Sequence, residues 1–468
     1  MPVEQSGLRR ELGPWSAAAI VVGTVIGSGI FLVPKDMIQH VGSPGMVFLV
    51  WVAGGLLSLA GALSYAELAA AMPEAGGEYV FLREAYGPFW GFLYGWTQMW
   101  VAKSGSIATL ATAFFVYLAN FHPALERVFY ALPLPVGPGG GPLELRYGQV
   151  LAVAVILFLA AVNYLGVRVG GRVQVAVTVI KLGLIAGIVL IGLAWGQGTV
   201  SHFRTGIAVG GGVAGFFAAL VAALWAYDGW NNVSMVSSEI RSPQRSLPVA
   251  LIGGTLVVIG VYLLANLAYF FVLPAAQVAA SERVAAEMMR AVLGDYGAAA
   301  VSVAAMVSIF AALNGSILSG ARVPYAMARD GLFFRSFSRV HPAFATPGIS
   351  ILGLSAWGAL LVFSGRYEEL FRYVIFASWI LYGMTAAAVL VLRVRRPELR
   401  RPYRTVGYPV LPALFVLGAL SVVFYTFLNF PRESILGIAL IFLGIPFYVY
   451  WKRRPNWGGS GSGAGGAR

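Results

Sequence analysis

Residues 23–31 read GTVIGSGIF, in the middle of the first apolar segment of the chain. Three glycines and a serine fall within seven positions of this stretch. A glycine in a helix interior costs about 1 kcal/mol relative to alanine, so the cluster favours an unwound stretch. The alternative is a continuous helix in which Gly23 and Gly27 form a GxxxG surface for close packing. The stretch therefore predicts either a break or a packing face in the middle of a helix.

A second candidate interruption lies at residues 225–232, which read WAYDGWNN inside another apolar segment. An acid, a glycine and two amides occupy four of the five positions from Asp228 to Asn232. An aspartate in the middle of a lipid-facing helix is costly, so this stretch must face protein or water. The alternative to a break is an intact helix whose polar side chains are satisfied by neighbouring helices.

Composition places both stretches in a membrane protein. The chain has 468 residues, of which 59% are hydrophobic and 11% charged, and its mean hydropathy is +0.78. Soluble domains carry about 25% charged residues. Apolar segments of about 20 residues, long enough to cross a bilayer, recur along the whole chain. We therefore predict an all-α polytopic membrane protein with twelve transmembrane helices, at residues 15–35, 44–72, 88–119, 147–165, 173–196, 210–238, 247–273, 297–328, 347–364, 369–392, 407–429 and 432–451.

The distribution of positive charge predicts the orientation. The net charge is +13, which in a soluble protein would suggest a nucleic-acid partner. Here 21 of the 32 Lys and Arg residues fall on one side of the twelve-span arrangement and 9 on the other. The positive-inside rule makes the richer side cytoplasmic. We therefore expect a multi-pass protein of the cell inner (plasma) membrane, no nucleic-acid partner, a cytoplasmic N-terminus at residues 1–14, and a flexible cytoplasmic Gly/Ser-rich tail at residues 452–468.

The chain has no cysteine and four histidines. No disulfide-linked subunit, thiolate metal site or cysteine nucleophile is therefore possible. The histidines lie near the ends of the expected spans, so we expect no metal site and no cofactor. The spans contain no HExxH motif and no paired aspartates, so we do not expect an enzyme.

The two interruptions lie in the first and the sixth expected spans, and these positions indicate a possible repeat. If spans 1–5 (residues 15–196) and 6–10 (residues 210–393) are an inverted repeat, the breaks occupy corresponding positions. Residues 407–451 would then add two helices. Matching interruptions of this kind are the best sequence pointer to the substrate site of a transporter. A half-helix N-terminus can bind a carboxylate, and freed carbonyls near Asp228 can bind an ammonium group. The pattern predicts a receptor for a zwitterion.

Several motifs resemble those of one transporter superfamily. They are GTVIGSGIF, YAELAAAMPEAGGEYVFLREAYG, VQVAVTVIKLG, WAYDGWNNVSMVSSEIRSPQRSLP, YLLANLAYF and LNGSILSGARVPYAMARDG, in this order. The chain resembles the amino acid–polyamine–organocation superfamily over about residues 13–450, and most closely a prokaryotic member of its L-type (heterodimeric-type light-chain) branch. This resemblance implies a LeuT-type five-plus-five inverted repeat with broken helices 1 and 6 and two additional helices, and transport by alternating access.

The resemblance also implies site residues. The substrate carboxylate would contact the first break, and the amino group would contact the carbonyls near Trp225 and Ala226. Trp225 would also cover the substrate as an aromatic gate. The expected substrate-binding residues are Thr24, Ile26, Gly27, Ser28, Gly29, Trp225, Ala226, Asp228 and Asn231.

Lys181 lies about eight residues into the fifth expected span. In relatives, a lysine here resembles a built-in substitute for the sodium ion of sodium-coupled carriers. The resemblance implies a coupling role, in contact with the carbonyl end of the first break and with hydroxyls of span 8, for which Ser308 and Ser316 are candidates. The alternative is a lysine that extends toward the cytoplasmic surface. The coupling role implies sodium-independent exchange.

Two residues depart from the animal L-type pattern. Asp228 stands where those members carry glycine. It could favour cationic substrates, couple protons, or pair with Lys181 or Lys103. We interpret Lys103, in the middle of span 3, as a structural ion-pair member.

Charged residues at the cytoplasmic ends of spans suggest an inner gate. Glu67 and Glu239 end spans 2 and 6, and we expect them to pair with Arg83, Arg241 and Arg245. The alternative is an ordinary solvated rim.

The sequence thus predicts a sodium-independent exchanger of small neutral L-amino acids. The alternative is a proton-coupled carrier of cationic amino acids or polyamines. Animal L-type members pair with a glycoprotein through a cysteine, so we expect this cysteine-free chain to work without a heavy chain.

Overall fold

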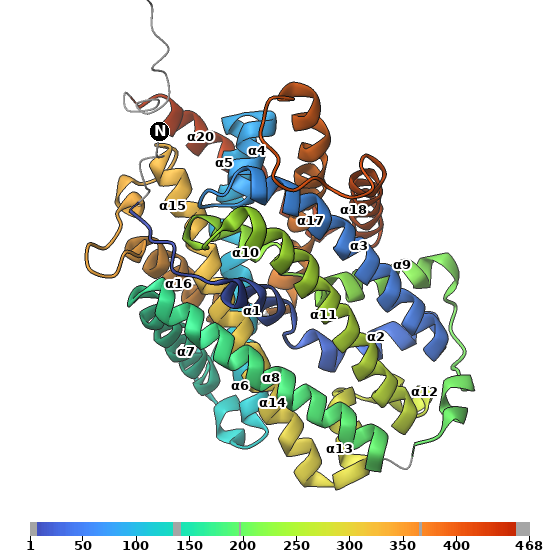
Figure 1. The fold of residues 1–468 in the computed structure, drawn as a ribbon. Coiled ribbons are helices and arrows are strands. Elements are labelled where there is room, and N and C mark those ends of the chain that lie inside the picture. The colour runs from blue at the N-terminus through green and yellow to red at the C-terminus, as the bar shows by residue number, and fades with distance from the viewer. Residues whose placement is uncertain (1–6, 134–141, 196–197, 365–366, 455–468) are drawn as a thin grey trace, which may run out of the picture.

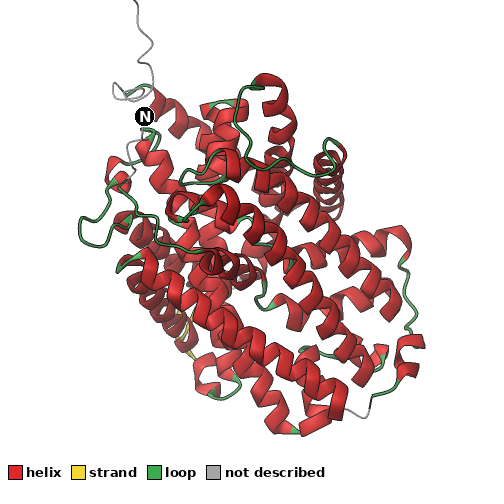
Figure 2. Ribbon diagram, in the orientation of Figure 1, coloured by secondary structure: helices red, strands yellow, loops and turns green. Residues whose placement is uncertain are grey.

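The computed structural model describes residues 7–133, 142–195, 198–364 and 367–454. Nearly all regular structure in this part of the chain is helical (Figures 1 and 2). Strands β1 (Val128–Leu132) and β2 (Leu143–Arg146) form one small antiparallel hairpin. The predicted helical class is confirmed. From residue 455 on, the expected tail lies outside the described residues.

The first expected span is broken. Helix α1 (Pro14–Val25) ends before the glycine cluster, and helix α2 (Gly29–Val41) begins within it. The axes of the two helices are bent by 42°. Ile26, just after α1, has extended backbone angles of φ −74° and ψ 90°, which no longer continue the helix. The break is confirmed, and the continuous helix was the wrong alternative.

The sixth expected span is also broken. Helix α9 (Gly212–Ala226) ends at Ala226, and helix α10 (Asn232–Met235) begins five residues later. Between them Gly229 has φ +110°, a conformation that side chains with a Cβ rarely adopt. The break is confirmed. The expected span was too long at its end, because α10 has only 4 residues and a 3₁₀ turn, η5 (Ser237–Glu239), follows it.

Most of the remaining helices overlap the other expected spans. They are α3 (Pro44–Ala71), α5 (Pro88–Thr97), η1 (Gln98–Ala102), α6 (Lys103–Ala119), α7 (Tyr147–Tyr164), α8 (Val167–Trp195), α11 (Pro243–Val272), α14 (Asp295–Gly320), α15 (Arg322–Arg329), α16 (Gly348–Val362), α17 (Tyr367–Arg395), α18 (Val410–Asn429), α19 (Pro431–Phe442) and α20 (Gly444–Lys452). The helices between the expected spans are α4 (Glu78–Tyr86), η2 (Pro123–Glu126), η4 (Val200–Arg204), α12 (Ala275–Ala280), α13 (Val284–Leu293) and η6 (Arg335–Ser338). Of these, η1 is a π-helical turn that joins α5 to α6.

The described helices support a polytopic membrane protein. In the part of the chain that the structure describes, 9 spans are long and apolar enough to cross a bilayer, and the bent pair α1–α2 makes 10. Two shorter apolar helices, α9 and α16, have 15 residues each and lie at expected span positions. The polytopic class is thus confirmed. The arrangement of twelve spans as an inverted repeat stays a prediction.

Helix α1 lies near the centre of the bundle (Figure 1). Helix α1 packs against α8, α11 and α14, and α2 packs against α9, α12 and α13 (Figure 1). In Figure 1 α4, α15 and α20 lie toward one end of the bundle, here called the N-terminal end because the segment before α1 is fixed there, and α12 and α13 lie toward the opposite end. The segment before α1 is fixed at the N-terminal end, since the backbone of Leu12 bonds to Glu239 and Arg241 at 2.9 Å each.

Candidate functional site

The two breaks touch each other. The hydroxyl of Thr24, near the end of α1, lies 2.9 Å from the carbonyl oxygen of Gly229. A Cβ added to Gly29 would lie only 2.9 Å from the Cβ of Ala226, so α2 begins directly against the end of α9. Glycine is needed at position 29 because any side chain would separate these two helix ends.

The structure brings the expected substrate residues together at this contact. The first break contributes the buried residues Thr24, Ile26, Gly27, Ser28 and Gly29. The second contributes the half-buried Trp225, which packs against the hydrophobic core, the buried Ala226 and Asn231, and the partly buried Asp228. Which of these side chains touch a substrate stays a prediction.

Helix ends supply complementary chemistry at the contact. The last carbonyls of α1 and α9 and the first amides of α2 have no partner within their own helices. Carbonyl oxygens accept hydrogen bonds from an ammonium group, and the amide end of a helix favours an anion. The arrangement therefore offers acceptors and donors within one buried region.

Lys181 on α8 lies fully buried at the first break. Its ammonium nitrogen is 2.8 Å from the carbonyl oxygen of Gly23 and also donates to that of Ile26. The carbonyl oxygen of Ser308 lies 3.3 Å away. The side chain does not extend to the surface, and it places a fixed cation where α1 ends. This carbonyl contact agrees with the expectation for Lys181.

The expected hydroxyl partners of Lys181 need correction. The hydroxyl of Ser308 lies 2.8 Å from the carbonyl oxygen of Ile26, so Ser308 meets the lysine through its own carbonyl group. Ser316 is buried, and no hydrogen bond joins it to Lys181 in the described part of the chain. Ser316 lies eight residues further along α14, which is about 12 Å of helix and too far for a shared contact.

Tyr262 on α11 is a site residue that sequence reasoning missed. Its hydroxyl lies 2.6 Å from the carbonyl oxygen of Ala226 and 3.1 Å from that of Val25. Tyr262 therefore touches the last carbonyl of α9 and the last carbonyl of α1. The only signal in the sequence is a tyrosine within an apolar span, and many such tyrosines merely pack.

Asp228 and Lys103 do not form the expected ion pairs. The carboxylate of Asp228 accepts a hydrogen bond of 2.9 Å from the hydroxyl of Tyr382 on α17. The ammonium group of Lys103, directly after the π-helical turn η1, donates to the side-chain oxygen of Asn232 at 2.6 Å. Among the described residues no salt bridge joins Asp228 to Lys103 or Lys181, and each of Asp228 and Lys103 hydrogen-bonds to a neutral side chain instead.

Asn231 is held by a buried carboxylate. Its side-chain nitrogen donates to Glu78, whose other carboxylate oxygen lies 3.2 Å from the hydroxyl of Ser234. Glu78 is fully buried at the start of α4, and burial raises the pKa of its carboxyl group. Sequence reasoning did not single out Glu78, which lies in a polar connection between two spans.

Glu67 and Glu239 form salt bridges, but not with the bases that the sequence suggested. Glu239 forms a fully buried ion pair with Arg322 of α15, with N–O distances of 2.7 and 2.9 Å. Glu67 pairs instead with Arg393 at 2.7 Å and with Arg401 at 3.3 Å. The solvated-rim alternative is wrong for both acids, because both are buried.

Two of the three expected bases, Arg83 and Arg241, have other side-chain contacts. Arg83 pairs with Asp330 at 2.5 Å, and Asp330 raises the pKa of this guanidinium group against the effect of burial. Arg241 donates to the backbone of Arg10. Sequence neighbours were thus a poor guide, because the partners of Glu67 and Glu239 come from segments far along the chain.

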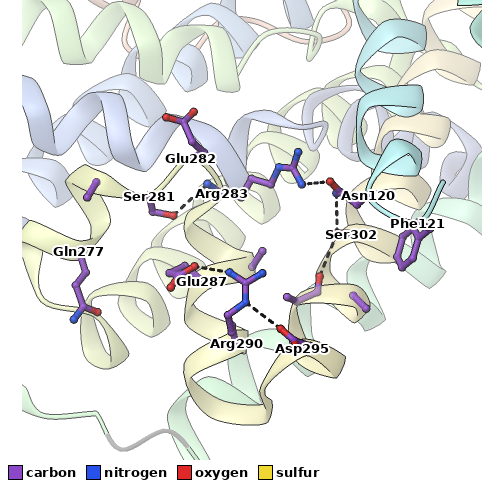
Figure 3. Close-up of a pocket in the computed structure, with 14 residues that line it drawn as sticks. Asn120, Phe121, Gln277, Ser281, Glu282, Arg283, Glu287, Arg290, Asp295 and Ser302 are labelled. Atoms are coloured by element: carbon purple, nitrogen blue, oxygen red, sulfur yellow. Dashed lines mark hydrogen bonds and ion pairs between the residues drawn. The ribbon is translucent and has the colours of Figure 1, made fainter. Parts of the chain in front are cut away.

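The opposite end of the bundle carries a polar pocket of about 800 Å³ (Figure 3). In it, Arg283 donates to Asn120, and Asn120 lies 3.3 Å from the hydroxyl of Ser302. Arg290 pairs with Glu287 at 2.9 Å and with Asp295 at 3.4 Å. The lining thus carries both signs of charge, and its dashed contacts in Figure 3 join α6, α13 and α14.

Two contacts beside this pocket fasten α2 to the segment around α12. Lys35 pairs with Glu282 at 2.5 Å, and the side chain of Gln39 donates to the carbonyl oxygen of Ala279 at 2.7 Å. Lys35 lowers the pKa of Glu282, which is fully exposed. We call these four residues, Lys35, Gln39, Ala279 and Glu282, the latch. It connects the second half of α2 to α12 and the residues after it.

Comparison with known proteins decides the family. The family described as amino acid permease matches residues 12–450. The chain belongs to the amino acid permease family. It is 34% identical to the serine/threonine exchanger SteT of Bacillus subtilis over 97% of this chain and 99% of that protein. It is 32% identical to the mouse b(0,+)-type amino acid transporter 1 (96% and 90% covered) and 29% identical to the human cystine/glutamate transporter (97% and 88% covered).

This membership agrees with the resemblance seen in the sequence. The permease is a multi-pass membrane protein of a transporter family, and neither the family nor these relatives are enzymes. The two touching breaks therefore lie in a protein whose family moves amino acids.

Proposed function

We propose that the permease exchanges small neutral L-amino acids across the membrane by alternating access, without sodium. The observation that carries the proposal is the contact between the two breaks, with the ammonium group of Lys181 fixed in the first. Three relatives that cover nearly the whole chain are named as an exchanger or as amino acid transporters.

The substrate carboxylate would lie at the start of α2, against the amides of Gly27, Ser28 and Gly29. The ammonium group would lie against the carbonyl of Ala226, and Trp225 would cover the substrate. The helix ends support this orientation, because the amide end of α2 favours the anion and the carbonyl end of α9 favours the cation.

Lys181 supplies the positive charge that a sodium ion supplies in related carriers. Its two short contacts with the carbonyls of Gly23 and Ile26 support this role, since a cation must hold these freed carbonyls together. A covalently attached cation cannot leave with the substrate. Transport would then need no sodium gradient, and exchange of one amino acid for another would be the natural mode.

The architecture that goes with this function is a LeuT-type fold. We assign residues 15–196 and 210–393 to two inverted repeats and residues 407–451 to two additional helices. The N-terminal end of the bundle would face the cytoplasm, because most of the basic residues fall there under the twelve-span arrangement. The protein would work in the plasma membrane as a single chain without a heavy chain.

A second candidate function rests on Asp228. This carboxylate lies in the second break, and its partner is a neutral hydroxyl rather than a cation. It could balance the side chain of a cationic amino acid or polyamine and take part in proton coupling.

Counterflow in proteoliposomes tests the proposal. Purified permease should take up labelled serine or alanine only when the lumen holds an unlabelled amino acid, with equal rates with and without sodium. Uptake into empty liposomes driven by a pH gradient, with lysine preferred over alanine, would instead establish the second function. No uptake of any amino acid in either format would refute both.

A further inference from the structure

The buried acid Glu78 has no role in the function proposed so far. It begins the short helix α4, outside the expected spans, yet its side chain is completely covered. Burying a carboxylate is expensive unless hydrogen bonds compensate for the lost water. Its donors come from the second break and from α10, so the cost of its burial is tied to the site.

Two glycines bring Glu78 to this position. The backbone nitrogen of Gly76 donates to the carbonyl oxygen of Met235 at 2.9 Å, so the turn before α4 docks on α10. Gly77 has φ +53°, and a Cβ there would lie 2.6 Å from the hydroxyl oxygen of Ser234. The chain can approach α10 this closely only because no side chain intervenes.

The chemistry of a carboxylate fixes the orientation of Asn231. An ionised carboxylate only accepts hydrogen bonds, whereas an asparagine amide offers a donor nitrogen and an acceptor oxygen. Asn231 must therefore turn its nitrogen toward Glu78 and its side-chain oxygen away, as observed. Among the described residues, that oxygen is buried and has no hydrogen-bond partner.

An unpaired buried acceptor in the second break needs a donor. Buried polar atoms are nearly always paired, and an exception calls for an explanation such as an absent ligand. The neighbouring Asn232 is already held by Lys103, so the side-chain oxygen of Asn231 is the acceptor that stays available there. An amino acid carries suitable donors in its ammonium group and, for serine or threonine, in its hydroxyl group.

We propose that Glu78 is a positioning residue for substrate recognition: by holding the amide nitrogen of Asn231, it presents the side-chain oxygen of Asn231 to a hydrogen-bond donor of the bound amino acid. This inference rests on the proposed function. In this proposal Glu78, which lies outside the expected spans, determines that the side-chain oxygen of Asn231, and not its nitrogen, faces the substrate.

Glu78→Gln is the decisive variant. A glutamine keeps the size of the side chain but can offer either its oxygen or its nitrogen, so the amide of Asn231 is free to turn over. We expect the KM for exchange to rise about tenfold, because the substrate loses one hydrogen bond from a charged or strongly polar donor. The kcat should stay within about twofold of the wild-type value. The matched control is Glu84→Gln on the same helix, which changes a partly buried partner of Arg83 and Arg396 and should leave KM unchanged.

A double-mutant cycle separates positioning from a general loss of structure. If Glu78 acts through Asn231, the effects of Glu78→Gln and Asn231→Ala on KM should not add in the double variant. Measurement with alanine and serine identifies the donor, because an equal effect on both indicates the ammonium group and a larger effect on serine indicates the hydroxyl group. Additive effects, or a KM for Glu78→Gln equal to that of the Glu84→Gln control, would overturn the inference.

Failure of this inference can be told apart from failure of the proposed function. If Glu78→Gln fails to fold by size-exclusion chromatography, Asn231→Ala still tests the acceptor, and an unchanged KM in that variant overturns the inference. If the wild-type permease exchanges amino acids but the variants show normal KM values, only the role of Glu78 is lost. If the wild type shows no exchange, the proposed function itself fails.

Discussion

The hydroxyl of Tyr262 lies 2.6 Å from the carbonyl oxygen of Ala226, the last residue of α9. The same hydroxyl lies 3.1 Å from the carbonyl oxygen of Val25, the last residue of α1. A tyrosine hydroxyl has one proton, so it donates to one of these carbonyls at a time. One side chain of α11 thus joins the ends of both interrupted helices.

Tyr262→Phe should slow exchange while the protein remains folded. The ring packs edge-on against Trp51, with centroids 5.0 Å apart, and phenylalanine preserves this contact. The lost hydrogen bond should lower stability by about 1 kcal/mol. Because Tyr262 then no longer links the ends of α1 and α9, we expect at least a fivefold lower exchange rate in proteoliposomes. The control is Tyr227→Phe, whose hydroxyl bonds to Trp51 instead, and equal rates for the two variants would contradict the prediction.

Lys181→Ala should lower turnover at normal expression. The carbonyls of Gly23 and Ile26 would lose their shared cation in a buried environment, so the end of α1 would no longer be held. We expect exchange to fall by about tenfold or more, the cost of leaving buried polar groups unpaired. Initial exchange rates per folded transporter check this expectation. Wild-type exchange by this variant would remove the coupling role.

Gly29→Ala should impair substrate binding. The added Cβ would lie 2.9 Å from the Cβ of Ala226 and would push α2 away from α9. We expect a KM at least tenfold higher in exchange assays. Gly253→Ala on α11 is the matched control, because a Cβ there meets nothing within 4 Å and alanine favours the helix. A normal KM for Gly29→Ala would show that the contact of the breaks does not shape the site.

Trp225→Ala should weaken the retention of substrate. The half-buried ring packs near the contact of the two breaks, and its Cζ3 atom would lie 3.6 Å from a Cβ at position 29. Removal of a large aromatic cover should raise KM by about tenfold or more, in line with the loss of a buried aromatic contact. Binding of labelled amino acid to purified protein measures the effect directly. Kinetics identical to those of the wild type would exclude a gate at this position.

The latch between Lys35 and Glu282 should respond to acid. Lys35 lowers the pKa of Glu282 in the folded protein, so the pair contributes above the ordinary glutamate pKa. Its contribution is lost as the pH falls through the lowered pKa of Glu282, which lies below the ordinary glutamate value. We expect Lys35→Gln to reduce hydrogen-exchange protection of α12 and α13 relative to wild type at pH 7 and not at pH 3. A difference that persists unchanged at pH 3 would assign the effect to packing.

Much of the fold was predictable because it follows from composition along the chain. Each long helix begins and ends near an expected boundary, since the bilayer demands about 20 consecutive apolar residues. The breaks were predictable for the same reason, because glycines near Ile26 and polar residues around Asp228 are unfavourable inside an apolar helix. The end of the sixth expected span was less accurate, because the α-helix after the break, α10, has only 4 residues.

The partners of charged residues were less predictable. Glu239 pairs with Arg322, which is 83 positions away, and Glu67 pairs with Arg393, which is 326 positions away. The nearby bases Arg83 and Arg241 looked equally suitable in the sequence. Residue type restricts which pairs are chemically possible, but distance along the chain does not say which of them meet.

The sequence by itself determined that this protein is a bundle of membrane helices with two candidate interruptions and a lysine within an apolar span, because hydrophobic length and helix propensity are local properties. Tertiary structure alone decided that Tyr262 joins the two interruptions, that Glu78 orients Asn231 and that Lys181 meets carbonyl oxygens rather than serine hydroxyls. Those contacts depend on how several helices pack in three dimensions, where a shift of a few ångströms replaces one hydrogen-bond partner with another.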